Sequence, residues 1–101
     1  MDATKRKQLE ARGWRFGTAS EFLRLTPADE AYIEMKLTLS KAVERKRKAC
    51  HLTQKQLAKL MGSSQPRVAM MERGDQSVSL DLLARGLLAL GVKPRRLAAI
   101  L

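Results

Sequence analysis

Apolar residues recur at helical spacing along most of the chain, and capping residues divide this pattern into separate helices. Between Pro27 and Cys50, apolar side chains return every three or four positions, which predicts one long helix. Thr26 precedes it as a cap, and Pro27 takes the first helical position, where a missing N–H is tolerated. Asp29 and Glu30 then face the positive end of the helix dipole.

Four shorter helices follow the long one. Each opens with Thr, Ser or Pro, and most of them end at a glycine. They are predicted at residues 54–61, 65–73, 80–90 and 95–101. The pattern therefore predicts an all-α domain of five helices that spans residues 26–101.

Residues 1–25 follow a different pattern and are predicted to form a partly flexible N-terminal arm. Residues 1–12 are polar and charged, which favours a loose segment or a frayed helix. Between Gly13 and Leu25 apolar and polar residues partly alternate. That alternation predicts a short strand or an extended arm.

The composition is consistent with one small helical domain. The chain has 101 residues, of which 45% are hydrophobic but only 4% aromatic. Its core must therefore consist mainly of Leu, Met, Val, Ala and Ile, and this mixture favours helices over a β-sandwich or barrel.

Charge is the most unusual global property. The chain carries 20 Lys and Arg against 10 Asp and Glu, a formal net charge of +10. This excess favours a polyanionic partner, either nucleic acid or anionic lipid, although a merely basic protein would show it too. Residues 41–73 hold nine basic and two acidic residues, whereas residues 16–35 hold one basic and four acidic. Two different partners could use these two regions.

Several classes of protein are disfavoured. Cys50 and His51 are the only cysteine and the only histidine, so neither an internal disulfide nor a structural zinc site is expected, and a reducing cytoplasm is the default location. No signal peptide and no run of about 18 apolar residues is found, so no membrane association is expected. The chain lacks a nucleophile–base pair and a Gly-rich phosphate loop, so neither enzymatic activity nor a cofactor is expected. Few aromatics and no RNP-type or KH-type motif disfavour RNA.

Residues 53–74 have the pattern of two helices joined by a tight turn. Ala58 is small enough for the two helices to approach closely, and Gly62 stands where the chain must turn sharply. The side chains expected to fill the angle between the helices are Leu57, Met61, Val68 and Met71. The outer face of the second helix has few charges amid basic surroundings, which suits base edges in a major groove.

This pattern resembles the Xre/Cro-type helix-turn-helix repressors over residues 53–92. Within that family, residues 64–68 (SQPRV) and 21–27 (EFLRLTP) are most similar to the HigA-like antitoxins. The resemblance implies a dimeric DNA-binding repressor of its own operon, in the cytoplasm at the nucleoid, that also neutralises a toxin protein. The alternative is a stand-alone Xre-type repressor without a toxin.

The resemblance also implies roles for individual residues. The residues expected to read bases are Gln65, Pro66, Arg67 and Met70. The residues expected to hold the DNA backbone are Gln54, Ser64, Arg73, Gln76 and Ser77. Arg47 is expected to form a structural ion pair with Glu72, which lies toward the inner side of its helix and needs a partner there.

Three groups of residues leave two readings open. Leu97, Ile100 and Leu101 could form a dimer interface on an inverted-repeat operator or pack back on the core. Trp14, Phe16 and Phe22 could contact a toxin or cover the open side of the long helix. In the basic run 45–48, Arg45 and Lys46 could hold phosphates or form a solvated face.

Overall fold

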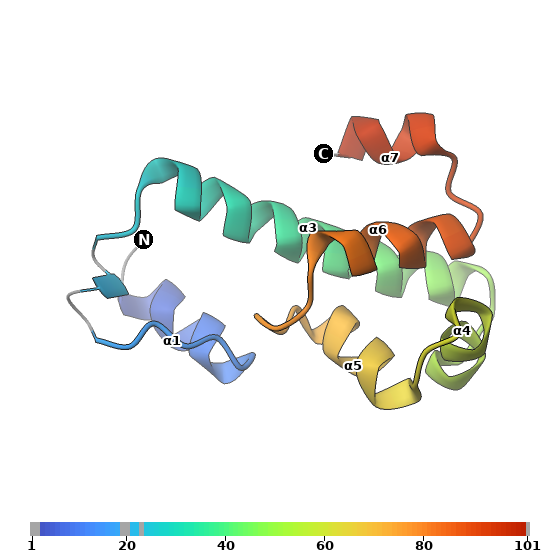
Figure 1. Cartoon of the computed structure of the whole chain (residues 1–101), viewed down its shortest axis with the longest axis horizontal. Helices are drawn as coiled ribbons and strands as arrows, with labels where there is room; N and C mark the ends of the chain where they lie inside the picture. Colours follow the sequence, from blue (N-terminus) through green and yellow to red (C-terminus); the bar gives the residue numbers. More distant parts are fainter. Residues whose placement is uncertain (1–2, 19–20, 23, 101) are drawn as a thin grey trace.

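The computed structural model describes residues 3–18, 21–22 and 24–100. Within them the chain is mostly helical, with a long connection after the first helix and short ones between the later helices (Figure 1). The helices are α1 (Ala3–Ala11), α3 (Pro27–Ala49), α4 (Gln54–Met61), α5 (Gln65–Arg73), α6 (Leu80–Ala89) and α7 (Pro94–Ile100). We call α3–α7 the C-terminal body and residues 3–25 the N-terminal segment.

The helices of the C-terminal body begin where the capping pattern predicts. Thr26 and Thr53 each form a capping box with the third residue of the helix they open. Ser64 and Ser79 cap α5 and α6 by accepting hydrogen bonds from the backbone N–H of Arg67 and Leu82. The all-α prediction is thus confirmed for this body, with helix ends shifted by one residue at most.

One apolar cluster holds the C-terminal body together. It joins α3, α4, α5, α6 and α7, and several members have no exposed surface. Its buried members are Leu39, Val43, Leu57, Ala58, Val68, Met71, Val78, Leu83, Leu87, Leu90 and Leu97. Long helix α3 and α6 lie side by side, with α4 and α5 below them and α7 above in Figure 1. The core thus lies behind α5 and fixes its orientation.

The N-terminal segment corrects two predictions. Ala3–Ala11 is a helix, so the described part of the chain contains one helix more than the five predicted. No strand is present among the described residues, where Thr18 and Phe22 instead make a helix-like backbone hydrogen bond of 3.1 Å. A strand needs a partner for its backbone groups, and this all-helical fold offers none.

The segment packs against the first half of α3. Leu9 and Trp14 form a second apolar cluster with Ile33 and Leu37 of α3. Lys5 adds an ion pair of 2.8 Å to Glu34. Helix α3 therefore carries two clusters, one toward each region of the molecule.

Candidate nucleic-acid interface

Helices α4 and α5 form the two-helix unit that the sequence predicts. Gly62 ends α4 in the left-handed conformation, with φ of 66°, and allows the sharp turn into α5. Leu57 and Ala58 of α4 meet Val68 and Met71 of α5 in the buried cluster. These contacts leave the opposite side of α5 facing outward.

The outward side of α5 carries the residues expected to read bases. Gln65, Pro66 and Arg67 are exposed, and Met70 is half-buried. A shallow hollow separates this face from the start of α6. It is lined by Ser64, Pro66, Arg67, Met70, Ser77, Val78 and Leu82. The fold thus gathers three of the four expected base-reading residues with two of the expected backbone-binding residues.

Gln54 and Gln65 are hydrogen-bonded to each other, which sequence reasoning missed. The amide of Gln65 donates to the side-chain oxygen of Gln54 at 2.7 Å, and the amide of Gln54 donates to Glu72 at 3.1 Å. The orientation of Gln65 is therefore set by a chain of polar contacts that leads into the core. The sequence predicts a separate DNA contact for each of the two residues. It does not predict their bond, because no spacing rule links the first residues of two helices.

Glu72 is also bound by Arg47, in the arrangement expected for a structural pair. The guanidinium donates to the two carboxylate oxygens at 2.5 and 2.9 Å and to the carbonyl of Leu52 at 2.7 Å. The hydrogen bonds to Glu72 raise the pKa of Arg47, while burial opposes that rise. The side chains are 11% and 3% exposed, so this ion pair is shielded from water.

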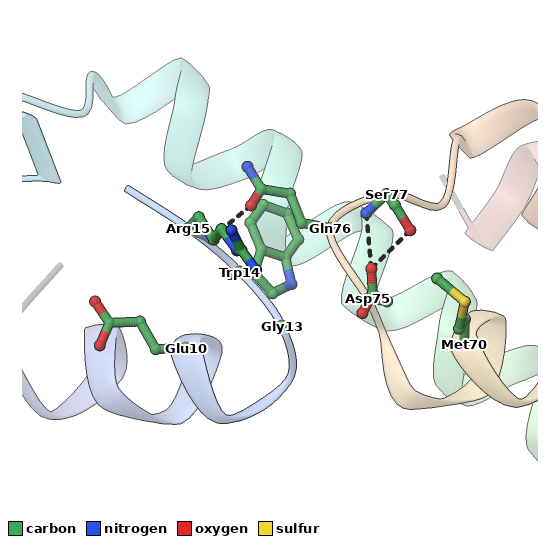
Figure 2. Close-up of a pocket in the computed structure, with 8 residues that line it drawn as sticks. All are labelled: Glu10, Gly13, Trp14, Arg15, Met70, Asp75, Gln76 and Ser77. Atoms are coloured by element: carbon green, nitrogen blue, oxygen red, sulfur yellow. Dashed lines mark hydrogen bonds between the residues drawn. The ribbon is translucent and has the colours of Figure 1, made fainter. Parts of the chain in front are cut away.

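The last residue of α5 and the loop that follows it contain three of the residues expected to hold the DNA backbone. Arg73 and Ser77 both bind Asp75: the guanidinium at 3.0 Å, and the N–H and hydroxyl of Ser77 at 3.0 and 2.7 Å. These bonds, chiefly those from Ser77, lower the pKa of Asp75 although burial opposes the change. Gln76 is exposed beside them (Figure 2).

The loop is bonded to the N-terminal segment. The indole N–H of Trp14 donates to the carbonyl of Gly74 at 2.7 Å, and the backbone N–H of Arg15 donates to the side-chain oxygen of Gln76 at 2.6 Å. Buried Lys36 of α3 donates to the backbone carbonyl of Gln76 at 3.0 Å. Burial lowers the pKa of Lys36. Neither Arg15 nor Lys36 was expected to act here, because their contacts lie 61 and 40 residues away along the chain.

The four basic side chains at residues 45–48 have different partners and face different parts of the surface. Arg47 enters the buried pair, and Lys48 forms an exposed pair of 3.1 Å with Glu44. Arg45 and Lys46 line a groove that α7 residues also line. In Figure 1, α7 and α5 lie on opposite sides of α6. This run is therefore not a single cationic strip.

Trp14 and Phe22 of the N-terminal segment are buried, with 5% and 2% of their surface exposed, whereas Phe16 is half-buried. Phe16 stacks on Trp14 with ring centres 6.2 Å apart and meets Phe22 edge-on at 4.9 Å. Lys36 lies over the Trp14 ring at 5.2 Å. In this conformation a partner could reach Phe16 but not the other two rings.

Residues of the apolar tail differ in burial. Leu97 is 8% exposed and belongs to the main cluster, and Ile100 is half-buried beside it. Leu101, and Leu23 of the stretch at residues 21–27, lie outside the described residues. Packing onto the body accounts for Leu97, while the outer side of Ile100 remains open to solvent.

The described residues form neither a membrane-spanning helix nor a metal-binding cluster. None of their helices combines the length and apolar character needed to cross a membrane. No group of three or more His, Cys, Asp or Glu side chains is placed to hold a metal ion in this part of the chain.

Comparison with known families gives one result. The family model described as Helix-turn-helix matches residues 43–97, which include α4, α5, α6 and the turn between the first two. The chain has no match among curated proteins or among solved structures. The matched range covers more than half of the chain.

Proposed function

Given that the chain belongs to the helix-turn-helix family, whose Xre-like type regulates transcription by binding DNA, we propose that it reads specific sequences in duplex DNA with α5. The outer face of α5 supports this most directly. Gln65, Pro66 and Arg67 are exposed there, opposite the buried Val68 and Met71. A major groove is wide enough to take a helix in this orientation.

Each exposed side chain of α5 suits one kind of base contact. The guanidinium of Arg67 can donate two hydrogen bonds to guanine, and the amide of Gln65 can pair with adenine. Pro66 and Met70 offer apolar contact to a thymine methyl group. Because Gln54 already binds the amide of Gln65, this side chain is partly oriented before DNA arrives.

Flanking residues would hold the phosphates on either side of that groove. In this proposal they are Gln54, Ser64, Arg73, Gln76 and Ser77. Such contacts fix the register of the protein on the duplex without reading sequence. The surplus of positive charge at residues 41–73 would add long-range attraction.

Selection of bound duplexes from a random DNA library, at near-physiological salt, tests the proposal. We expect one sequence motif to be enriched. Arg67→Ala should then weaken binding of that motif by about 1–3 kcal/mol and relax the preference at one base pair. Equal weakening on all duplexes would make Arg67 a phosphate contact, and no enrichment would overturn sequence-specific recognition by the isolated protein.

We propose further that the protein binds as a dimer, because one short helix reads too few bases for high specificity. The open side of Ile100 on α7 is the contact we assign; Leu97 supports it from the core, and Leu101 is the next residue in the sequence. An enriched inverted repeat with half-sites about 34 Å apart would support the dimer. Sedimentation of the complex should give two copies per duplex, and Ile100→Asp should reduce this to one.

Neutralisation of a toxin protein is a second candidate function. It is favoured by the resemblance of residues 21–27 and 64–68 to HigA-like antitoxins and by the acidic excess at residues 16–35. Co-expression with the product of the neighbouring gene tests it. Growth arrest that this chain relieves, together with a purified complex, would support an antitoxin. Normal growth without this chain would leave a stand-alone repressor.

A further inference from the structure

A hollow lies between the N-terminal segment and the loop that follows α5. Its lining residues are Glu10, Gly13, Trp14, Arg15, Met70, Asp75, Gln76 and Ser77. Figure 2 shows Glu10 of α1 on one side, Met70 of α5 on the other, and Gln76 beside Arg15 between them. The hollow therefore continues the proposed DNA-facing surface beyond the two-helix unit.

In the part of the chain that the structure describes, the carboxylates around the hollow are paired with cations, whereas one cation is not paired with a carboxylate. Glu10 is paired with Arg6 at 2.7 Å, and Asp75 is paired with Arg73 at 3.0 Å. Arg15 is exposed, and its guanidinium has no carboxylate partner among the described residues. Both carboxylates of the lining thus have a cation, and Arg15 leaves one positive charge unmatched.

The backbone holds Arg15 in place. Its N–H is bonded to the side-chain oxygen of Gln76, and the neighbouring indole of Trp14 is bonded to Gly74. Because the oxygen of Gln76 is taken, the amide nitrogen of this side chain is the group left to donate outward. Arg15 and Gln76 both line the hollow, and their bond to each other uses the backbone of Arg15, which leaves its guanidinium available to a ligand.

We infer that this hollow binds a backbone phosphate of duplex DNA, with Arg15 as the cation and Gln76 as a second donor. The planar guanidinium can donate two hydrogen bonds to one phosphate. The inference rests on the proposed function, because α5 must face the groove for the strand to pass over the hollow. It extends the DNA contact to the N-terminal segment, which lies outside the matched family range.

Salt dependence of binding tests the inference. The probe is a fluorescein-labelled, mixed-sequence duplex of about 20 base pairs, two turns of B-DNA. Removing one phosphate contact should reduce the slope of log K against log salt by about 0.9. Arg15→Ala should therefore weaken binding about fivefold at 0.15 M salt. Arg15→Lys keeps the charge and should retain most of the slope.

Arg95→Ala is the matched control, since it removes an arginine of α7 that is also exposed. If Arg15→Ala lowers the slope and Arg95→Ala does not, the inference is supported. If the two variants have equal slopes, or Arg15→Ala has the wild-type slope, the inference is overturned while the proposed function stands. If the wild-type protein binds no duplex at all, the proposed function itself fails.

Discussion

The C-terminal body and the N-terminal segment are held in place in different ways. The body buries one large apolar cluster contributed by five helices, and α3, α4, α5 and α6 each begin at a local cap. The segment contributes Leu9 and Trp14 to a smaller cluster whose other buried members, Ile33 and Leu37, belong to α3. Hydrogen bonds from Trp14 and Arg15 to the loop after α5 also hold the segment against the body.

This difference indicates an order of dependence. The body contains most of its own core, so its stability should not require the segment. The segment buries too little apolar surface of its own to offset the entropy of ordering it, so its conformation should require the body. Four predictions test or refine this contrast.

The largest effect is expected from breaking the buried ion pair of the body. Arg47→Ala leaves the carboxylate of Glu72 buried with only Gln54 as a partner, and should lower the free energy of unfolding by about 3–5 kcal/mol. Urea denaturation followed by circular dichroism measures it. The double variant Arg47→Met, Glu72→Leu should recover most of the loss. A loss below about 1 kcal/mol would contradict the role assigned to this pair.

Cavities in the two clusters should act differently. Leu57→Ala in the body should destabilise the whole fold by about 2–5 kcal/mol. Leu9 is as well buried, but Leu9→Ala should open the N-terminal segment locally and leave global unfolding little changed. Hydrogen exchange resolved by residue distinguishes the two. Equal global destabilisation by both variants would mean that the two regions unfold as one unit, against the contrast drawn above.

Trp14→Phe should loosen the junction between the regions. The substitution keeps a ring but removes the N–H that donates to buried Gly74, and leaving that carbonyl without a donor should cost about 1–3 kcal/mol of local stability. Faster exchange at the N–H of Arg15, with α4 and α5 unchanged, would show it. Unchanged exchange at Arg15 would mean that this hydrogen bond does not hold the segment.

A smaller effect should follow from pH. The pKa of Asp75 is lowered in the folded state, so its contribution to stability is full above the unfolded value of about 3.9 and is lost as pH falls through the lower folded value. Asp75→Asn should therefore flatten the decline in stability below about pH 4. Denaturation at a series of pH values measures this. Asp29→Asn is measured in the same way for comparison, because hydrogen bonds with Thr26 also lower the pKa of Asp29.

Local signals made the body predictable. Thr53, Ser64 and Gly62 mark the ends of α4 and α5 in the sequence, and the structure uses each of them as a cap. Apolar spacing identified Leu57, Val68 and Met71 as inward-facing, and all three are fully buried. These features depend on residues within one or two helical turns of each other, which a single sequence displays directly.

Contacts between distant residues were not predictable. Leu9 is the one buried residue of α1 in the described part of the chain. The sequence therefore shows no apolar stripe from which this helix could be predicted. The ion pair of Lys5 with Glu34 and the hydrogen bond from Trp14 to Gly74 join positions that no periodicity connects. The bond between Gln54 and Gln65 depends on the angle between two helices, which spacing does not specify.

The distance along the chain between the N-terminal segment and its partners has a consequence for protein synthesis. Trp14 and Arg15 are synthesised before Gly74 and Gln76, to which they bond and which lie 60 and 61 residues later. At a typical elongation rate of about 5–20 residues per second, several seconds pass between the synthesis of Trp14 and that of the loop after α5 to which it bonds. The N-terminal segment is therefore synthesised before the loop on which its position depends. During that interval its apolar surface is open to chaperones.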